Sequence, residues 1–342
     1  MWKELSVWFF LAIIVINNFC ESSPASTHMH SGREREEDGG YSPRDHNHIV
    51  NGEHHVEFDH EAILGSVKEA EEFDQLPPEE ARKRLAVLLK KMDLDSDENI
   101  SRKELKAWIL RSFKMLSDEE AKERMEDADE NEDGKVSWAE HVADSYGSDH
   151  SEEDDEIDEH GNAIMKLKNM DIEDEKLMKD DKVLFDVADL NKDGLLDAKE
   201  YPFFSHPEEH PEMWPIILQQ TLREKDMDND GRISFQEFVG GESGTRQKDR
   251  EWLISEKDKF DHDFDKDGDG SLDSSEIIAW MVPSNEEIAE EEVTHLFASS
   301  DDDHDDLLSF AEILDHHDIF VGSEATDYGD HLHNIHTFSD EL

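Results

Sequence analysis

Six stretches of twelve residues place oxygen-bearing side chains at alternate positions and end in glutamate. A hard cation such as calcium takes six to eight oxygen ligands at about 2.3–2.6 Å, and a loop of this length supplies them by wrapping around the ion. The spacing therefore predicts six calcium-binding loops, which we number in chain order. They run from Asp93 to Glu104, Asp129 to Glu140, Asp189 to Glu200, Asp226 to Glu237, Asp265 to Glu276 and Asp301 to Glu312.

Within each loop, we expect positions one, three and five to supply side-chain oxygens, position seven a backbone carbonyl, and position twelve both oxygens of a carboxylate. The side chain at position seven is then free to vary, as it does in this chain. The predicted metal ligands, loop by loop, are Asp93, Asp95, Asp97, Asn99 and Glu104; Asp129, Asn131, Asp133, Lys135 and Glu140; Asp189, Asn191, Asp193, Leu195 and Glu200; Asp226, Asp228, Asp230, Arg232 and Glu237; Asp265, Asp267, Asp269, Ser271 and Glu276; and Asp301, Asp303, Asp305, Leu307 and Glu312.

Two apolar positions repeat around these loops. Position eight, where paired loops meet through a short strand, is Ile100, Val136, Leu196, Ile233, Leu272 and Leu308. The residue four positions before the loop, on the incoming helix, is Leu89, Met125, Phe185, Leu222 and Phe297 in five repeats. The fifth repeat departs from this pattern with Asp261. Such helix–loop–helix units are EF-hands, so the predicted fold class is all-α, with short β bridges between paired loops.

The distances between loops suggest how the hands pair. Successive loops begin 36, 60, 37, 39 and 36 residues apart, and the widest gap separates the second hand from the third. EF-hands bury their apolar faces in pairs, so we expect three two-hand lobes, over residues 76–147, 166–241 and 242–320, with an acidic linker at 148–165. The aromatic residues that follow the odd-numbered loops, Trp108, Phe204 and Trp280, are expected to pack in the cores. A role as exposed anchors for a partner stays open.

Composition narrows the function. The chain of 342 residues carries 91 acidic against 34 basic side chains, a net charge of −57. Such a surface repels nucleic acids and anionic membranes. A hydrophobic content of 35% favours small charged modules over one large core. Neither a nucleotide-binding glycine loop nor a nucleophile elbow is present, so we expect no enzyme and no cofactor other than Ca²⁺.

The two ends of the chain resemble targeting segments. Residues 1–22 have a short apolar stretch typical of a cleaved secretory signal peptide, with a membrane anchor as the alternative. Cleavage would remove Cys20, the only cysteine. An acidic, histidine-rich segment at 23–75 follows, and a tail at 321–342 ends in Ser339-Asp340-Glu341-Leu342, which is similar to an endoplasmic reticulum retrieval signal. We therefore expect the lumen of the endoplasmic reticulum, a retrieval receptor as partner, and passage to the Golgi or secretion if retrieval is incomplete.

These features together resemble the reticulocalbin, calumenin and Cab45 family. The segment from Tyr201 to Glu209, just after the third loop, is also similar to that family. The resemblance implies low-affinity luminal calcium binding and calcium-dependent contacts with secretory proteins.

Two function classes therefore stay open. One is a calcium buffer that folds or compacts when calcium binds. The other is a calcium-dependent regulator that exposes methionine-rich grooves to secretory clients, calcium pumps or channels. The methionines on or beside the EF-hand helices are Met92, Met115, Met125, Met213 and Met281.

Loops one and six are expected to be the weaker sites. Position six normally requires glycine because the backbone turns sharply there, but these loops have Glu98 and Asp306. Loop one also contains a glycosylation sequon at Asn99, whose occupancy stays open.

Histidines and one short motif allow weaker hypotheses. We expect the histidines near both ends to lie in solvated linkers, with zinc capture or pH sensing as alternatives. They are His28, His30, His46, His48, His54, His55, His60, His316, His317, His331, His333 and His336. The segment from His206 to His210 has the spacing of some zinc peptidases, but its prolines favour a loop that caps the third hand.

Overall fold

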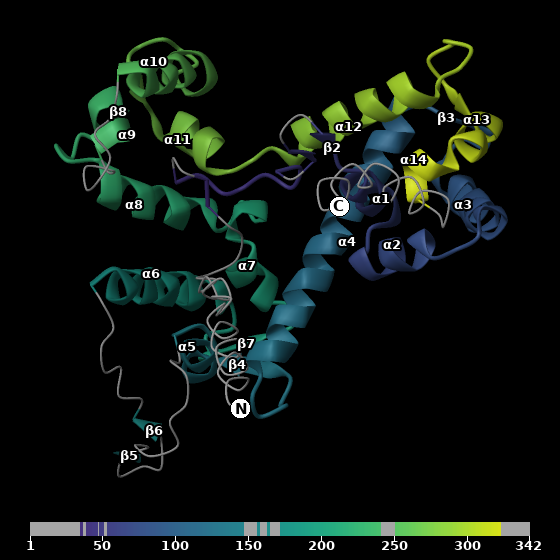
Figure 1. The fold of residues 1–342 in the computed structure, drawn as a ribbon. Coiled ribbons are helices and arrows are strands. Elements are labelled where there is room, and N and C mark those ends of the chain that lie inside the picture. The colour runs from purple at the N-terminus through teal and green to yellow at the C-terminus, as the bar shows by residue number, and fades with distance from the viewer. Residues whose placement is uncertain are drawn as a thin grey trace, which may run out of the picture.

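Helices dominate the chain, and its strands are short and paired (Figure 1). The computed structural model describes residues 35–36, 39–46, 48–50, 53–146, 156–157, 163–164, 172–240 and 250–322. The expected signal peptide, the retrieval-like tail and most of the acidic linker lie outside these residues. Within them, no helix combines the length and the apolar character needed to cross a bilayer.

Six helix–loop–helix units follow one another in the described residues. Their helices are α3 (Pro78–Met92), α4 (Arg102–Ala128), α5 (Trp138–Tyr146), α6 (Ile172–Ala188), α7 (Tyr201–Ser205), α8 (Trp214–Lys225), α9 (Phe235–Gly240), α10 (Arg250–Lys259) with η2 (Phe260–Phe264), α11 (Ser274–Met281), α12 (Asn285–Ser300) and α13 (Phe310–Asp315). Their loop strands are β3 (Asn99–Ile100), β4 (Lys135–Ser137), β7 (Leu195–Asp197), β8 (Ile233–Ser234), β9 (Ser271–Leu272) and β10 (Leu308–Ser309). The all-α class is confirmed.

Further elements precede, join or follow the hands. They are β1 (Ile49–Val50), β2 (Glu53–His54), α1 (Glu57–Leu64), α2 (Val67–Asp74), β5 (Glu156–Ile157), β6 (Ala163–Ile164), η1 (Pro207–Glu209) and α14 (His317–Val321).

The loops pair through antiparallel bridges, but not between the neighbours we expected. Loop one pairs with loop six, loop two with loop three, and loop four with loop five. The prediction that hands one and two, three and four, and five and six form the lobes is therefore wrong. The position-eight residues do face one another, as Ile100 with Leu308, Val136 with Leu196, and Ile233 with Leu272. All six are fully buried.

Helix α4 explains the pairing. It serves both as the outgoing helix of hand one and as the incoming helix of hand two, and its 27 residues contain neither glycine nor proline. At about 1.5 Å per residue it is roughly 40 Å long. Figure 1 shows β3 near one end of this rod and β4 near the other. The first two loops therefore cannot meet, and each must find another partner.

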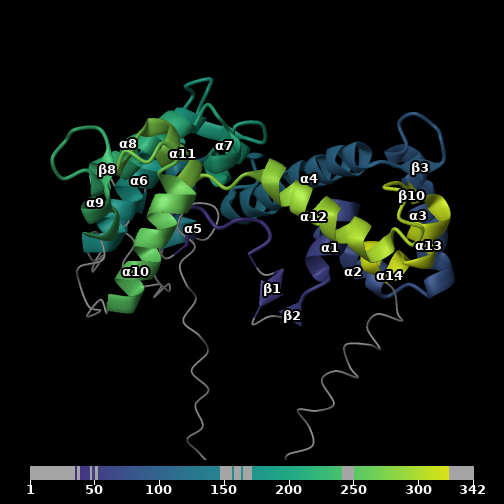
Figure 2. The same ribbon diagram turned by 90° about the horizontal axis from the view of Figure 1, so that it is seen from above.

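Hand one pairs with hand six, the last hand of the chain. Helix α12 lies along α4 (Figure 2), which brings loop six beside loop one. The Phe310 amide donates to the Glu98 carbonyl at 3.3 Å, and Arg102 Nε donates to the Asp306 carboxylate at 2.6 Å. Arg102 and Asp306 are 204 positions apart in sequence.

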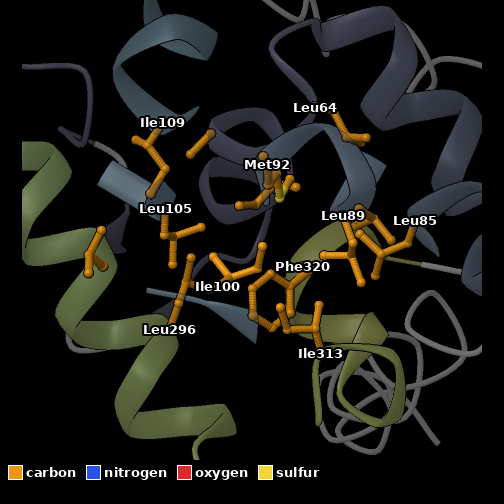
Figure 3. Close-up of a cluster of buried hydrophobic side chains, with 14 of the residues drawn as sticks. Leu64, Leu85, Leu89, Met92, Ile100, Leu105, Ile109, Leu296, Ile313 and Phe320 are labelled. Carbon is orange, nitrogen blue, oxygen red and sulfur yellow. The ribbon is translucent and has the colours of Figure 1, made fainter. Parts of the chain in front are cut away.

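Three hydrophobic clusters accompany the three loop pairs. The first joins α1–α4 with α12–α14, and Figure 3 shows Leu85, Leu89 and Phe320 packed near Ile100. The second combines the end of α4 with α6, α7 and loops two and three, and the third surrounds Phe260 and Trp280. Helix α4 contributes to two clusters, with Leu105 in the first and Met125 in the second.

A π turn explains the exceptional fifth hand. In the other five hands, the first amide of the loop donates to the carbonyl four residues earlier, but the Asp265 amide donates to Phe260, five residues earlier. One extra residue is thereby inserted before the loop. Phe260 is fully buried where other hands use position −4, and Asp261 is exposed.

The aromatic and methionine side chains pack mainly inside. Phe204 and Trp280 are buried, and Trp108 packs against the first cluster and donates from Nε1 to the Ile63 carbonyl at 2.7 Å. Core packing is thus their role. Of the five methionines considered above, Met92, Met125, Met213 and Met281 are buried and Met115 is exposed.

Two of the histidines expected in solvated linkers are packed inside the protein. His60 and His317 are buried, and His60 Nε2 lies 2.9 Å from the Asp318 carbonyl oxygen. The solvated-linker prediction is therefore wrong for these two histidines, because α1 packs against α14. Residues 39–46 and 48, which we call the N-terminal strap, begin beside the third cluster, where the Tyr41 amide donates to the Met281 carbonyl at 2.9 Å.

Cysteine cross-linking tests the pairing of hands one and six. In a Cys20→Ser background, Asn99→Cys combined with Ser309→Cys should form an internal disulfide on mild oxidation. Directly opposed strand residues have Cα atoms about 4.5–5.5 Å apart, which suits a disulfide. The product is detected by its electrophoretic mobility with and without reductant. The control, Asn99→Cys with Lys135→Cys, joins loops one and two and should not cross-link; preferential cross-linking of this control would contradict the pairing.

Candidate calcium sites

All six loops adopt the same closed backbone arrangement around their first residue. The first aspartate accepts the amide of position six in every loop, at distances from 2.7 Å for Gly134 to Asp129 to 3.1 Å for Asp306 to Asp301. The residue at position five likewise accepts the amide of position seven. These bonds turn the chain so that the alternate side chains of a loop face one centre.

The closing glutamate folds back into its own loop. In each hand its carboxylate accepts the amide of position nine, as Glu237 does from Ser234 at 2.8 Å. In four hands it also accepts the amide of position two, for example Met227 to Glu237 at 2.9 Å. Position twelve is therefore held beside positions one and three, as a bidentate ligand must be.

Four loops bring three carboxylates together, with oxygens within 4.8 Å of one another. These groups are Asp93, Asp95 and Glu104; Asp226, Asp228 and Glu237; Asp265, Asp267 and Asp269; and Asp301, Asp303 and Glu312. Loops two and three have asparagine at position three, and its Nδ2 donates to the closing glutamate, at 2.6 Å from Asn131 and 3.3 Å from Asn191.

At position seven the predicted ligand is the backbone carbonyl, and three of the side chains there contact other groups. Lys135 Nζ donates at 2.6 Å to Asp193 in the paired loop three, and Arg232 donates to Asp269 in the paired loop five. Asn99 Nδ2 donates to the Asp97 carbonyl at 3.1 Å. Lys135 and Arg232 thus each compensate the charge of an acid in the paired loop.

The backbone at position six is left-handed in loops one and six. Glu98 has φ 67° and Asp306 has φ 65°, a conformation that costs non-glycine residues free energy. Loops one and six therefore adopt at position six the backbone conformation for which glycine is normally required, although neither has glycine there. Arg102 neutralises Asp306 at the pair interface.

Serine and aspartate at position nine hold the closing glutamate in place, a role that the spacing of the ligands alone does not predict. Ser101 and Ser309 form capping boxes, in which the serine accepts the amide of the closing glutamate while that glutamate accepts the serine amide. Asp273 does the same in the fifth hand. The sequence signal is the Ser/Asp-x-x-Glu spacing at a helix start.

The capping boxes change the acidity of the closing residues. Burial would raise the pKa of Glu312, but hydrogen bonds from Ser309 and from two loop amides outweigh burial and lower it below the ordinary value. Glu104 and Glu237 show the same direction for the same reasons. By contrast, desolvation and then the charge of Asp97 raise the pKa of Asp95.

The peptidase-like segment does not form a two-histidine helix. His206 Nε2 lies 3.0 Å from the Glu120 carboxylate on α4, whereas His210 stacks on Phe203. The element between them, η1, has only three residues. The segment packs beside the third hand, in agreement with a capping loop.

A family model described as EF hand matches residues 181–201, 218–239 and 262–282, which contain loops three, four and five. Together with the geometry, this match defines a multi-EF-hand calcium-binding protein.

Among known proteins, the chain is 40% identical over 297 residues to reticulocalbin-2 of Crotalus adamanteus, covering 85% of this chain and 93% of the relative. It is 38% identical over 309 residues to reticulocalbin-2 of Mus musculus and of Rattus norvegicus, in each case covering 89% of this chain and 93% of the relative. The chain therefore belongs to the reticulocalbin family.

Removing one capping serine tests the electrostatic role of these boxes. Ser309→Ala should destabilise the calcium-free protein by about 1 kcal/mol at pH 7, the usual cost of losing an N-cap. The pKa of Glu312 is lower in the folded protein than in the unfolded chain, where it is about 4.3. The resulting stabilisation is fully present at pH values above about 4.3 and is lost as the pH falls through the folded-state pKa.

The measurement is urea unfolding at pH 7 and near pH 3.5, followed by tryptophan fluorescence and far-UV circular dichroism. The difference in the free energy of unfolding between wild type and Ser309→Ala should be smaller at the lower pH. The control is Ser274→Ala, at an exposed helix-start serine. A gap that is independent of pH would mean that Ser309 does not set the acidity of Glu312.

Proposed function

We propose that this protein is a low-affinity, multi-site calcium buffer of the secretory-pathway lumen. The predicted ligands are positions one, three, five, seven and twelve of each loop, with up to six ions bound. The observation that carries the proposal is the repetition of one closed, glutamate-terminated loop six times in a chain of net charge −57.

Calcium binding should compact the protein because it reduces the repulsion between the acidic side chains. Six Ca²⁺ ions add 12 positive charges and reduce the net charge from −57 to −45. If each site is half filled, ligand binding contributes RT ln 2 per site, about 0.4 kcal/mol, or roughly 2.5 kcal/mol over six sites. This is a substantial share of the stability of a marginal domain. Calcium should therefore tighten the hands.

Buffering is favoured over the client-binding alternative because the methionines that would line a groove, Met92, Met125, Met213 and Met281, are buried in the cores. We assign the chain no catalytic step. The luminal location and retrieval by a receptor rest on residues 1–22 and on Ser339–Leu342.

Calcium titration tests the buffer proposal. Protein purified from the secretory pathway of expressing cells is titrated from 10⁻⁶ to 10⁻² M calcium at physiological salt and millimolar magnesium. Helix content by far-UV circular dichroism should rise, and the hydrodynamic radius should fall, at about 10⁻⁴–10⁻³ M, the range of extracellular-type EF-hands. As a control, Glu237→Gln should reduce the number of bound ions by at least one. Saturation at micromolar calcium would contradict the buffer and favour a sensor.

Loops one and six should fill last. In Glu98→Gly, relief of the left-handed backbone should be worth about 1–2 kcal/mol. The lost attraction of one exposed charge is smaller, below about 1 kcal/mol. We expect roughly a fivefold gain in the affinity of hand one, measured by site-resolved NMR titration. Glu98→Gln removes the charge but keeps the strain, and should show no gain. Filling of hands one and six before the others would contradict the ranking.

A further inference from the structure

A cluster of histidine and carboxylate side chains lies outside the six loops. It consists of His48 in the N-terminal strap, Asp59 on α1 and His295 on α12, whose ligand atoms lie within 4.8 Å of one another. His48 Nε2 is 2.8 Å from Asp59 Oδ1, and His295 Nε2 is 3.5 Å from Asp59 Oδ2. The three residues come from segments far apart in sequence, so the fold alone brings them together.

A second buried acid, Glu292, lies near the cluster, because Asp59, His48 and His295 all influence its charge. It precedes His295 by three residues, and residues at this spacing share one face of a helix. Its side chain is 2% exposed, and neither carboxylate oxygen receives a hydrogen bond from the described part of the chain. Burial, and then the charge of Asp59, raise the pKa of Glu292 to about 7. Burying a carboxylate without a hydrogen bond or a cation is costly.

We propose that His48, Asp59, His295 and Glu292 form a binding site for a zinc-like divalent cation. Two imidazoles with one or two carboxylates are a ligand set that zinc accepts, whereas calcium and magnesium take oxygen ligands. Tetrahedral zinc with bonds of about 2.0–2.1 Å places neighbouring ligand atoms roughly 3.3 Å apart. The 2.8 Å and 3.5 Å separations around Asp59 bracket that value.

Burial and access in the cluster also suit an ion. Asp59 is fully buried, while the side chains of His48 and His295 are 14% and 34% exposed. The carboxylates thus lie inside, and the imidazoles form the route from solvent. The His48 ring packs against Phe58, with ring centroids 4.8 Å apart, which helps to orient it. The divalent charge would balance the two buried carboxylates.

Zinc in this position would connect separate parts of the fold. It would tie the N-terminal strap to α12, the helix that leads into loop six. The same strap reaches the third cluster through Tyr41, which is buried there. The site is thus structural: it would fasten the strap across the first and third clusters, independently of calcium in the loops.

Zinc competition at saturating calcium and magnesium tests the site. A chromophoric chelator reports Zn²⁺ binding to the full protein with the hands already occupied. We expect wild type to retain one equivalent. His48→Gln and His295→Gln should each weaken zinc binding more than about 100-fold, because even changes behind the ligands cost 10–100-fold. The controls His46→Gln and His262→Gln change exposed histidines and should leave affinity unchanged.

Cobalt gives a second readout, which reports the coordination geometry as well as the affinity. Co²⁺ bound in this site should show the intense visible absorption of four-coordinate cobalt, and Glu292→Gln should alter that spectrum. Equal zinc binding by wild type, His48→Gln and His295→Gln would overturn the proposal, as would a faint six-coordinate cobalt spectrum that is the same in all three. In that case the histidines only balance the buried carboxylates. Because calcium is saturating throughout, neither outcome depends on the buffer proposal.

Discussion

The length of one unbroken helix governs the architecture. Because α4 leaves hand one and enters hand two without a break, the two loops lie at opposite ends of a rod about 40 Å long. Each hand still has an apolar position-eight residue to bury. Hand two buries this residue against hand three, which follows after a long connection. Hand one buries it against hand six, near the other end of the described chain. The pairing of Ile100 with Leu308 is the consequence, and it makes the described fold depend on contacts between its first and last hands.

Charge shapes the loops in addition to packing. The acids converge because backbone amides and capping serines hold them there, and basic residues then cross from one loop to its partner. Arg102, Lys135 and Arg232 each reach an acid in the neighbouring loop. The paired loops therefore share charge compensation as well as a β bridge. In a chain with 34 basic against 91 acidic residues, these basic side chains lie where they compensate acids at the pair interfaces.

Histidine has a different role in this chain from the one its distribution suggests. The histidines that precede and begin α1 look like part of a polar linker in sequence, but α1, α2 and the end of the strap pack onto the lobe of hands one and six. Buried His60 and the cluster of His48, Asp59 and His295 are products of this packing. The N-terminal region thus belongs to the lobe that the last hand completes.

Properties that depend on residues only a few positions apart could be predicted from the sequence. The twelve-residue loops, the buried position-eight residues and the all-α class all follow from local spacing, because the ligands and caps of each loop come from one short segment. The capping boxes were equally readable from their spacing. The absence of glycine and proline between Arg102 and Ala128 could also have indicated one continuous helix. The partner of each hand was decided only by tertiary structure, since pairing depends on how helix lengths carry the loops through space. The same is true of Phe260, which a π turn moves into the core position, and of the histidine and acid cluster, whose members are joined only by folding.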